Sequence, residues 1–571
     1  MTDCPHTLAC PGCTQQGVLY DQQLRHKQRR LLHALRPFAE LNNTSIAPIA
    51  PASPTLAYRT RAKWIVGPEG SLGLFARDPD HQVVDLPHCQ VVAPPILRVG
   101  QLVREALASP GWLRKHLRAV DLREISSPSG SGVLLTLIVQ DRPPPSVEQA
   151  RSAAAFLAAR SPEILGIALN LVSPFSPQVL GPTTLHLHGL TEADDLAGAS
   201  LVRATFGSFT QAHRGQAAAL QRAITELARG PVLELYGGSG AIGLTIARTG
   251  IPVDSVESFA PASQAAAKMA ARERLPFRAI TGDAVEVVSR LAREGTRYDL
   301  VVVNPPRRGL APSARKAIAA LAPRAIAYVS CEPRTLARDL AHLARLGYPA
   351  TRATPYDMIP QTDEVEVLVL LEQGSAPPPV VLLEVGEAMF LAREAHTPQE
   401  GATSLAARGR ALPGCEQAVL VGPADPEGSG ISVMVRKPES AGAWRTMLEN
   451  SHWWWVAWVR GVTRRAGHLG SEARYRRRKV HRGHSLLEIE GTIGKEQTIR
   501  ARLAGLGHPV LGDTHAGDDR TNRYFFEKFG LDRPFWHGFR VTLRGPTTLQ
   551  EVSVGCPWPA DLLLPGGPEP G

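Results

Sequence analysis

The sequence predicts an α/β protein built around a doubly wound parallel sheet in residues 201–373. Mostly apolar segments alternate with helical segments through short connections, near residues 231–236, 252–257, 277–282, 298–303 and 325–330. Segments that are apolar along their whole length are typical of parallel strands buried on both faces. A glycine-rich turn follows the first of them, and ligands bind at the carboxyl ends of the strands in such sheets.

The composition limits the class of protein. A chain of 571 residues is long enough for several domains, and 43% hydrophobic residues are typical of a globular protein. No apolar run reaches the ~18 residues of a membrane span, and the N-terminus does not resemble a signal peptide. We therefore expect a cytoplasmic protein without membrane contact. The net charge of +10 suits a polyanionic partner such as nucleic acid.

Residues 1–95 are expected to form an N-terminal metal-binding or cluster-binding region. Cys4, Cys10 and Cys13 lie close together in the sequence, and Cys89 is available as a fourth ligand. Four thiolates satisfy either zinc or an iron–sulfur cluster. The spacing alone favours neither.

The same region contains a basic segment. Arg59, Arg61 and Lys63 alternate beside Tyr58 and Trp64. On a strand, alternating residues share one face, so these cations can hold a phosphate backbone while an aromatic ring stacks a base. A solvated strand face is the alternative interpretation.

Residues 96–200 are expected to form a compact α+β unit that positions the substrate. The pattern is a strand at 120–125, a strand at 132–140, a helix at 147–160 and a strand at 165–172. Residues 374–380 are expected to be a stiff, proline-containing linker, and residues 381–571 a second domain.

Residues that suit a nucleoside cofactor follow the strands of the central domain. The turn containing Gly238 lacks the dinucleotide order G-x-G-x-x-G, which favours S-adenosylmethionine over NAD. Glu257 ends the next strand and can accept both ribose hydroxyls. Asp283 ends the third strand, where it can reach the adenine or cap a helix. Asn304 ends the fourth strand, where its amide can bind a base or the cofactor.

Two further residues suggest covalent chemistry. Cys331 ends the last parallel strand, and Arg334, Arg338 and a helix N-terminus near it predict a lowered thiol pKa. We expect Thr335 to cap that helix. Glu366 opens the following strand and should face the same edge of the sheet.

A thiol, a carboxylate base and a methyl donor match methylation of uracil at C5. A thiolate that adds to C6 makes C5 nucleophilic, so C5 can attack the methyl group. The base then removes the C5 proton and the thiol is eliminated. The Asn304-Pro-Pro sequence alone would instead indicate an amino-group methyltransferase, an enzyme class that needs no cysteine nucleophile.

Residues 1 to about 373 resemble the RNA (uracil-5-)-methyltransferase family, and within it the 23S rRNA enzymes that bind an iron–sulfur cluster and lack a TRAM domain. The resemblance is carried by the cysteine set and by Tyr58–Lys63 (Y-R-T-R-A-K), Gly207–Gln211 (G-S-F-T-Q), Asn304–Gly309 (N-P-P-R-R-G), Ser330–Asp339 (S-C-E-P-R-T-L-A-R-D) and Asp357–Glu366 (D-M-I-P-Q-T-D-E-V-E).

The resemblance implies a class I, Rossmann-like methyltransferase domain with Cys331 as nucleophile and Glu366 as base. It also implies a [4Fe-4S] cluster on the four cysteines and an RNA substrate, 23S rRNA, with no obligate protein partner. The implied cofactor contacts are Gln211, Tyr236, Glu257 and Asn304.

The sequence departs from the family pattern near the implied base. Glu332 stands where the family usually has Asn, Gln361 and Glu364 where it has His, and His213 where it has Asn. The added carboxylate beside Glu366 predicts a raised pKa for that base through like-charge repulsion.

Residues 485–513 resemble the RluA-type pseudouridine synthases, an α+β fold. Asp425 matches the catalytic aspartate of that family. The arginine expected two residues earlier is Pro423, and the expected tyrosine corresponds to Trp455. The histidine expected before Ile499 is also missing. We therefore expect a degenerate domain that binds RNA, with the tryptophans of residues 453–458 either stacking bases or packing the core, and the basic run 474–479 contacting phosphates.

Three functional hypotheses follow. The chain is an RNA methyltransferase, a bifunctional enzyme that also isomerises uridine, or a non-catalytic rRNA assembly factor. Cys331, Glu366 and the glycine turn favour a methyltransferase over the third hypothesis, while Pro423 and Trp455 argue against the second.

Overall fold

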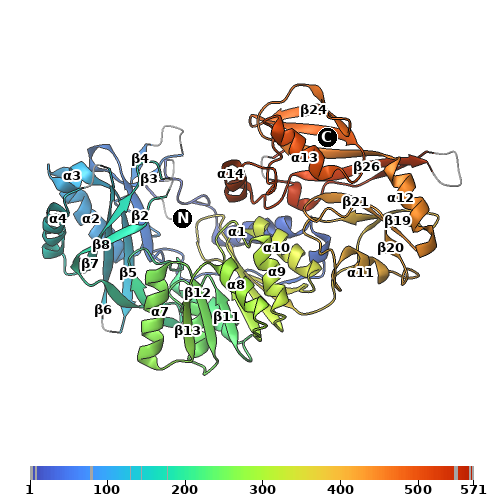
Figure 1. Cartoon of the computed structure of the whole chain (residues 1–571). Coiled ribbons are helices and arrows are strands. Elements are labelled where there is room, and N and C mark those ends of the chain that lie inside the picture. The colour runs from blue at the N-terminus through green and yellow to red at the C-terminus, as the bar shows by residue number, and fades with distance from the viewer. Residues whose placement is uncertain are drawn as a thin grey trace.

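The computed structural model describes all residues except 1–3, 7, 8, 78–81, 129, 143, 144, 177, 545–550, 565, 566 and 569–571. The chain folds around three large sheets, which follow one another from the blue N-terminal end to the red C-terminal end in Figure 1. No helix in the described part of the chain is both long and apolar enough to span a membrane.

The first sheet has seven strands in the order β4-β3-β2-β5-β6-β7-β8. Its strands are β2 (Arg61–Val66), β3 (Leu72–Phe75), β4 (Val83–Asp85), β5 (Leu117–Ser127), β6 (Gly130–Gln140), β7 (Ile164–Val172) and β8 (Thr183–Gly189). One face is covered by α2 (Pro94–Ala108), α3 (Trp112–His116) and α4 (Val147–Arg160), whose apolar residues share a core with the sheet. The strands expected in residues 96–200 are confirmed, and the sheet joins them to β2–β4 across the expected boundary at residue 95.

The second sheet has eight strands in the order β1-β16-β17-β15-β14-β11-β12-β13. Its strands are β1 (Ser45–Ile46), β11 (Val232–Leu235), β12 (Val253–Glu257), β13 (Phe277–Thr281), β14 (Leu300–Val303), β15 (Ala325–Ser330), β16 (Ala350–Tyr356) and β17 (Glu366–Glu372). All described strands run parallel except β17. The five expected parallel strands are thereby confirmed.

Helices cover both faces of this second sheet, as a doubly wound fold requires. One face packs against α1 (Tyr20–Leu35), α8 (Ala284–Arg293), α9 (Pro312–Ala320) and α10 (Pro333–Arg345). The other packs against α5 (Arg214–Thr225), α6 (Ala241–Ala247) and α7 (Ala260–Glu273), the last of which lies on β12 and β13. The hairpin β9 (Glu192–Ala197) and β10 (Ser200–Thr205) precedes α5. Figure 1 shows the N-terminal helix α1 beside α10, so part of the N-terminal region belongs to this domain.

The third sheet belongs to the C-terminal domain and follows residues 374–380, which form neither helix nor strand; the stiff linker expected there stays a prediction. Its main path is β18-β19-β21-β26-β22-β25-β24-β23, with β20 and β27 paired at β21 and β26. The strands are β18 (Val381–Val385), β19 (Ala388–Arg393), β20 (Val419–Leu420), β21 (Ser429–Val435), β22 (His452–Val459), β23 (Ala466–Leu469), β24 (Ala473–His481), β25 (His484–Gly491), β26 (Trp536–Arg544) and β27 (Glu551–Gly555), and the helices are α11 (Leu405–Arg410), α12 (Ala441–Glu449), α13 (Glu496–Gly505) and α14 (Asp519–Phe529).

The tryptophans of β22 pack mainly in the core of this domain. Trp453, Trp455 and Trp458 are buried, so base stacking by these three rings is excluded. Trp454 is half-buried beneath the guanidinium group of Arg540, 4.2 Å from the ring centre. On β24, Arg474 pairs with Glu490 and Arg478 pairs with Glu488. These ion pairs neutralise part of the positive charge expected of the basic run 474–479.

Candidate active site

A cavity of about 750 Å³ opens at the carboxyl edge of the central sheet. It gathers residues that are far apart in the sequence. The predicted residues in its wall are Gln211, Tyr236, Gly238, Glu257, Asn304, Cys331 and Glu366. The edge at which they meet is the one at which doubly wound sheets bind ligands.

The glycine turn forms one wall of the cavity. Tyr236, Gly238 and Gly240 all have positive φ angles, between 58° and 77°, so the chain turns sharply between β11 and α6. Gly238 donates its backbone N–H to the Glu257 carboxylate over 2.9 Å, which fixes that carboxylate beside the turn. A Cβ atom at Gly237 would lie 2.2 Å from Ser255 Oγ, so only glycine fits there.

Asp283 is not among the described residues that line the cavity. Its carboxylate caps α8 by accepting hydrogen bonds from the backbone N–H groups of Val285 and Glu286, over 2.8 and 3.1 Å. The capping alternative is thus the one that the structure displays, while adenine contact by Asp283 stays a prediction.

Cys331 directly follows β15, and Glu366 is the first residue of β17, the antiparallel neighbour of β15. Ser330 pairs with Val367 in the ladder between β15 and β17, so the residue after one strand lies beside the first residue of the other. Because β17 is antiparallel, its start reaches the edge at which the parallel strands end. The sequence prediction that Glu366 faces the same edge as Cys331 is confirmed.

The predicted lowering of the Cys331 pKa is wrong. Burial raises the pKa of this thiol to about 11, and the Glu366 carboxylate adds to the increase. The cations expected to oppose this effect are directed elsewhere. Arg338 donates to Asp339 and to the carbonyl of Arg308, and Arg334 is exposed. Arg307 is the guanidinium group that acts against the increase.

The helix after Cys331 also begins differently from the expectation. Glu332 is the N-cap of α10 and accepts a hydrogen bond from the backbone N–H of Arg334 over 3.4 Å. Thr335 lies inside the first turn. Its hydroxyl donates to the carbonyls of Arg307 and Glu332 over 2.8 and 3.2 Å, because the chain enters the helix at Pro333.

Glu366 has the raised pKa that the sequence predicts. Burial is the main cause and brings the pKa to about 8. Arg307 lowers it and the Glu364 carboxylate raises it. Arg307 and Glu364 form an ion pair of 3.0 Å across the mouth of the cavity, so this pair sets the charge near both Cys331 and Glu366.

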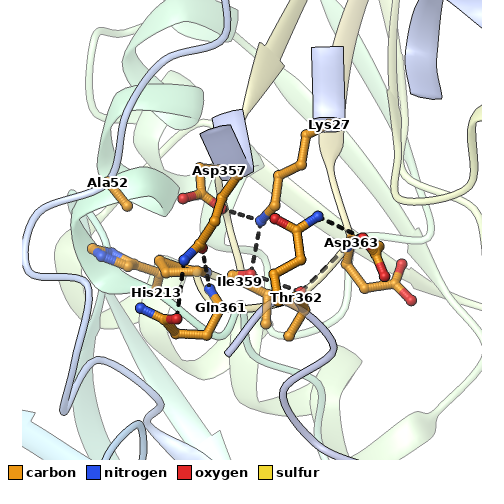
Figure 2. Close-up of polar contacts among 12 residues, drawn as sticks. Lys27, Ala52, His213, Asp357, Ile359, Gln361, Thr362 and Asp363 are labelled. Atoms are coloured by element: carbon orange, nitrogen blue, oxygen red, sulfur yellow. Dashed lines mark hydrogen bonds and ion pairs between the residues drawn. The ribbon is translucent and has the colours of Figure 1, made fainter. Parts of the chain in front are cut away.

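The segment 357–363 leads directly to Glu364 and Glu366, and helix α1 holds it in place (Figure 2). Lys27 is fully buried; it pairs with the fully buried Asp357 and donates to the carbonyl of Ile359 over 2.8 Å. Gln23 exchanges two hydrogen bonds of 3.0 Å with Gln361. No local sequence pattern indicates this role of α1, because the need of Asp357 for a cationic partner arises from its burial in the fold.

The four N-terminal cysteines meet at a second cavity of about 400 Å³, lined by Cys4, Cys10, Cys13 and Cys89. Burial, reinforced by the neighbouring thiols, raises the pKa of Cys13 to about 12. Burial also raises the pKa of Cys10 and Cys89. Gly12 donates its N–H to Cys10 Sγ over 3.4 Å. The structure therefore brings four thiols from two distant segments of the chain to one cavity.

The basic strand separates the two cavities. Ala62 and Trp64 face the core, whereas Arg61 and Lys63 point to the opposite side, so the predicted common face is confirmed. Arg59 and Lys63 line both cavities. Arg61 differs, because it forms a hydrogen-bonded ion pair of 2.8 Å with buried Asp121.

The C-terminal domain has a separate polar cavity of about 520 Å³ that contains Pro423 and Asp425. The Asp425 carboxylate lies 3.2 Å from the buried guanidinium group of Arg500. Trp455 is not in the wall described for this cavity; it stacks on Trp536 in the core, with 5.8 Å between ring centres. The residue expected to replace the missing tyrosine is therefore not placed beside Asp425.

Comparison with known proteins identifies similar chains. An uncharacterized RNA methyltransferase of Geobacter sulfurreducens is 32% identical over 390 residues, covering 64% of this chain and 76% of the relative. One from Gloeobacter violaceus is 28% identical and covers 65% and 82%. The crystal structure of Pyrococcus abyssi tRNA (uracil-54, C5)-methyltransferase in complex with S-adenosyl-L-homocysteine matches with a TM-score of 0.51 at 24% identity, covering 63% of this chain and 86% of that one, which supports the fold.

The family model of tRNA (uracil-5-)-methyltransferases matches residues 19–374, which include the whole central sheet and its cavity. The match covers more than half of the chain, so this chain belongs to the tRNA (uracil-5-)-methyltransferase family.

Proposed function

We propose that this protein methylates C5 of a uridine in RNA, with S-adenosylmethionine as methyl donor, Cys331 as nucleophile and Glu366 as base. The observation that carries the proposal is the placement of Cys331 and Glu366 at the ends of adjacent strands in one cavity, beside a glycine turn with a fixed carboxylate. An amino-group methyltransferase would have no use for this thiol.

The residues of the turn fit a nucleoside cofactor. The absence of a side chain at Gly238 leaves open space, because a Cβ atom there would meet nothing within 4 Å. Glu257 accepts from the Gly238 N–H through Oε2 and from the Phe259 N–H through Oε1, which orients the carboxylate toward ribose hydroxyls. Gln211, Tyr236 and Asn304 would complete the contacts. S-adenosylmethionine supplies a methyl group on a positively charged sulfur.

The residues of this chain then move two protons. The Cys331 thiol releases its proton to solvent, a step that Arg307 favours and burial opposes, and the thiolate sulfur then bonds to C6. C5 takes the methyl group and the thioether leaves. Glu366, once ionised, accepts the C5 proton, and the C6–sulfur bond breaks to restore the thiolate. Burial raises the pKa of Glu366 to about 8, so the fraction of Glu366 that can accept the C5 proton increases as the pH rises through that value.

We also propose a [4Fe-4S] cluster on Cys4, Cys10, Cys13 and Cys89. The donor set fits, because four partly buried thiols surround one cavity and each would be stabilised as thiolate by iron. Bound there, the cluster would cross-link the N-terminal segment to the loop that carries Cys89 and would supply no electrons, since methyl transfer needs no redox step. Arg59 and Lys63 would link its environment to the RNA-binding cavity.

We infer that 23S rRNA is the substrate and that the C-terminal domain aids RNA binding. The motif resemblance to 23S rRNA enzymes supports this choice, and tRNA is the competing substrate within the family. A second activity, pseudouridine formation, is favoured by one observation, the contact of Asp425 with buried Arg500 in a polar cavity.

The decisive assay measures transfer of a labelled methyl group to unmodified 23S rRNA and to unmodified tRNA. Cys331→Ala should abolish transfer, whereas Cys415→Ala, which removes a buried cysteine of the C-terminal domain, should retain it. Mass spectrometry should find 5-methyluridine at one position of 23S rRNA. Transfer by Cys331→Ala, or an N-methylated product, would refute the proposed mechanism. Asp425→Ala tests the second activity through loss of a pseudouridine.

A further inference from the structure

A buried ionic cluster lies directly behind the candidate active site. Its centre is the Asp339 carboxylate of α10, which is fully buried. Asp339 accepts hydrogen bonds from the Tyr328 hydroxyl over 2.7 Å and from the Leu310 N–H over 2.6 Å. It also pairs with Arg338 over 2.7 Å and with Arg315 over 3.0 Å. The cluster therefore ties the strand that ends at Cys331 to the loop that follows Asn304.

The methyltransferase domain contributes two guanidinium groups, those of Arg315 and Arg338, but only one carboxylate, that of Asp339, to this cluster. The second carboxylate comes from the C-terminal domain. Asp532 pairs with Arg315 and lies 3.4 Å from Arg338. Burial opposes ionisation of Asp532, but Arg338 and Arg315 outweigh it and hold its pKa well below the usual range. Two cations and two anions thus balance only when both domains are present.

The same segment of the C-terminal domain touches the active-site loop. The Gly530 carbonyl, just after α14, accepts a hydrogen bond from Arg338. Arg338 also donates to the Arg308 carbonyl over 2.9 Å. The Arg308 guanidinium lies over the ring of Phe526 of α14, 5.7 Å from its centre. In Figure 1, α14 stands at the edge of the C-terminal domain that faces α1 and α10.

We propose that the C-terminal domain is a positioning element for the methyltransferase site, acting through Asp532 and α14 on the loop 304–310. This inference rests on the proposed methyl transfer. The loop begins at Asn304 and includes Arg307, the cation that favours the Cys331 thiolate. A net buried positive charge after loss of Asp532 would displace Arg338, and with it the carbonyl of Arg308.

The test compares Asp532→Asn with Asp532→Glu and with Asp561→Asn. Asp561 is a matched control, because its two hydrogen bonds of 2.6 and 2.9 Å go to Arg533 of the same domain. Asp532→Asn should lower kcat for methyl transfer by about tenfold or more, with little change in the KM for RNA. Asp532→Glu should recover part of kcat, and Asp561→Asn should leave it near the wild-type value.

A second measurement reports the reactivity of the Cys331 thiol. The rate at which iodoacetamide alkylates Cys331, measured on its peptide by mass spectrometry, should fall in Asp532→Asn at each pH, because Arg307 is displaced. If Asp532→Asn does not fold, Phe526→Leu replaces it, and a two- to fivefold loss of kcat is expected from the weaker hold on Arg308.

The possible results distinguish failure of the proposed methyl transfer from failure of the proposed role of the C-terminal domain. Absence of methyl transfer by the wild-type chain would refute the proposed function. Transfer by the wild type together with unchanged kcat in Asp532→Asn, or in Phe526→Leu if that variant is used, would overturn the inference. So would an equal loss in Asp561→Asn, since it would indicate general destabilisation.

Discussion

At the scale of single residues, the charges around Glu366 decide when the site can work. Because the pKa of Glu366 is about 8, the fraction of this base that is ionised increases as the pH rises through that value. We therefore expect kcat to rise over the same pH range. Glu364→Gln removes a like charge and frees Arg307 from its ion pair, and both changes lower the pKa of Glu366. The rising limb of the pH–rate profile should therefore move to lower pH, by up to about one unit. An unchanged profile would show that Glu364 does not face the base.

The residue scale also shows what sequence could predict. The position of Cys331 followed from the apolar strand before it, and that of Glu366 from the strand after it. The direction of the Cys331 pKa did not follow, because it depends on where Arg338 points. Arg338 turns to a carbonyl 192 residues away in the sequence, which no local pattern reveals.

At the scale of elements, the buried contact between Lys27 of α1 and Asp357 should control both stability and catalysis. Lys27→Met leaves Asp357 as an unpaired buried charge, which should cost about 3–5 kcal/mol in the free energy of unfolding. It should also lower kcat, because the segment that leads to Glu366 loses its anchor. Urea unfolding and the methyl-transfer assay measure the two effects.

Arg29→Met provides the control on the same helix, since Arg29 is exposed, and it should change stability by less than about 0.5 kcal/mol. Equal effects of the two substitutions would contradict the anchoring role of Lys27.

The strands were predictable from their continuous apolar runs, but the role of α1 was not. Its key residues, Gln23 and Lys27, are polar and buried only because segment 357–363 covers them.

The geometry of the glycine turn predicts how a substitution at Gly237 affects cofactor binding. Gly237→Ala would place a methyl group 2.2 Å from Ser255 Oγ and 2.9 Å from Glu234 Oε2, both in buried side chains. The turn must then shift, and affinity for S-adenosylhomocysteine, measured by calorimetry, should fall more than about tenfold. Gly442→Ala, where the added methyl group meets nothing within 4 Å, should bind as the wild type does. Normal binding by Gly237→Ala would place the cofactor elsewhere.

At the scale of the whole molecule, the proposed cluster on the four cysteines would connect the N-terminal segment to the loop before α2. Cys13→Ala and Cys89→Ala should each lower the iron and sulfide content of anaerobically purified protein to background, because each removes one of four ligands. Cys556→Ala, which changes a buried cysteine of the C-terminal domain, should retain the iron. Stoichiometric zinc without sulfide in the wild type would contradict the cluster proposal.

Contacts between domains were the features of the whole molecule that the sequence predicted least well. The parallel strands within residues 201–373 were predicted because each is locally patterned. The docking of Asp532 on Arg315 and Arg338 was not, because ion pairs between domains leave no periodic signal. The tryptophans of β22 could be assigned to core or surface only once their neighbours in the sheet were known.

The most direct test of the central claim is to trap the bond between Cys331 and C6 of uracil. RNA that carries 5-fluorouridine should be methylated and then arrested, because Glu366 cannot remove fluorine from C5 as it would a proton. Incubation with the protein and S-adenosylmethionine should give a denaturant-stable protein–RNA adduct, with the nucleotide on the Cys331 peptide in mass spectra. No adduct, or an adduct on another residue, would contradict the assignment of Cys331 as nucleophile.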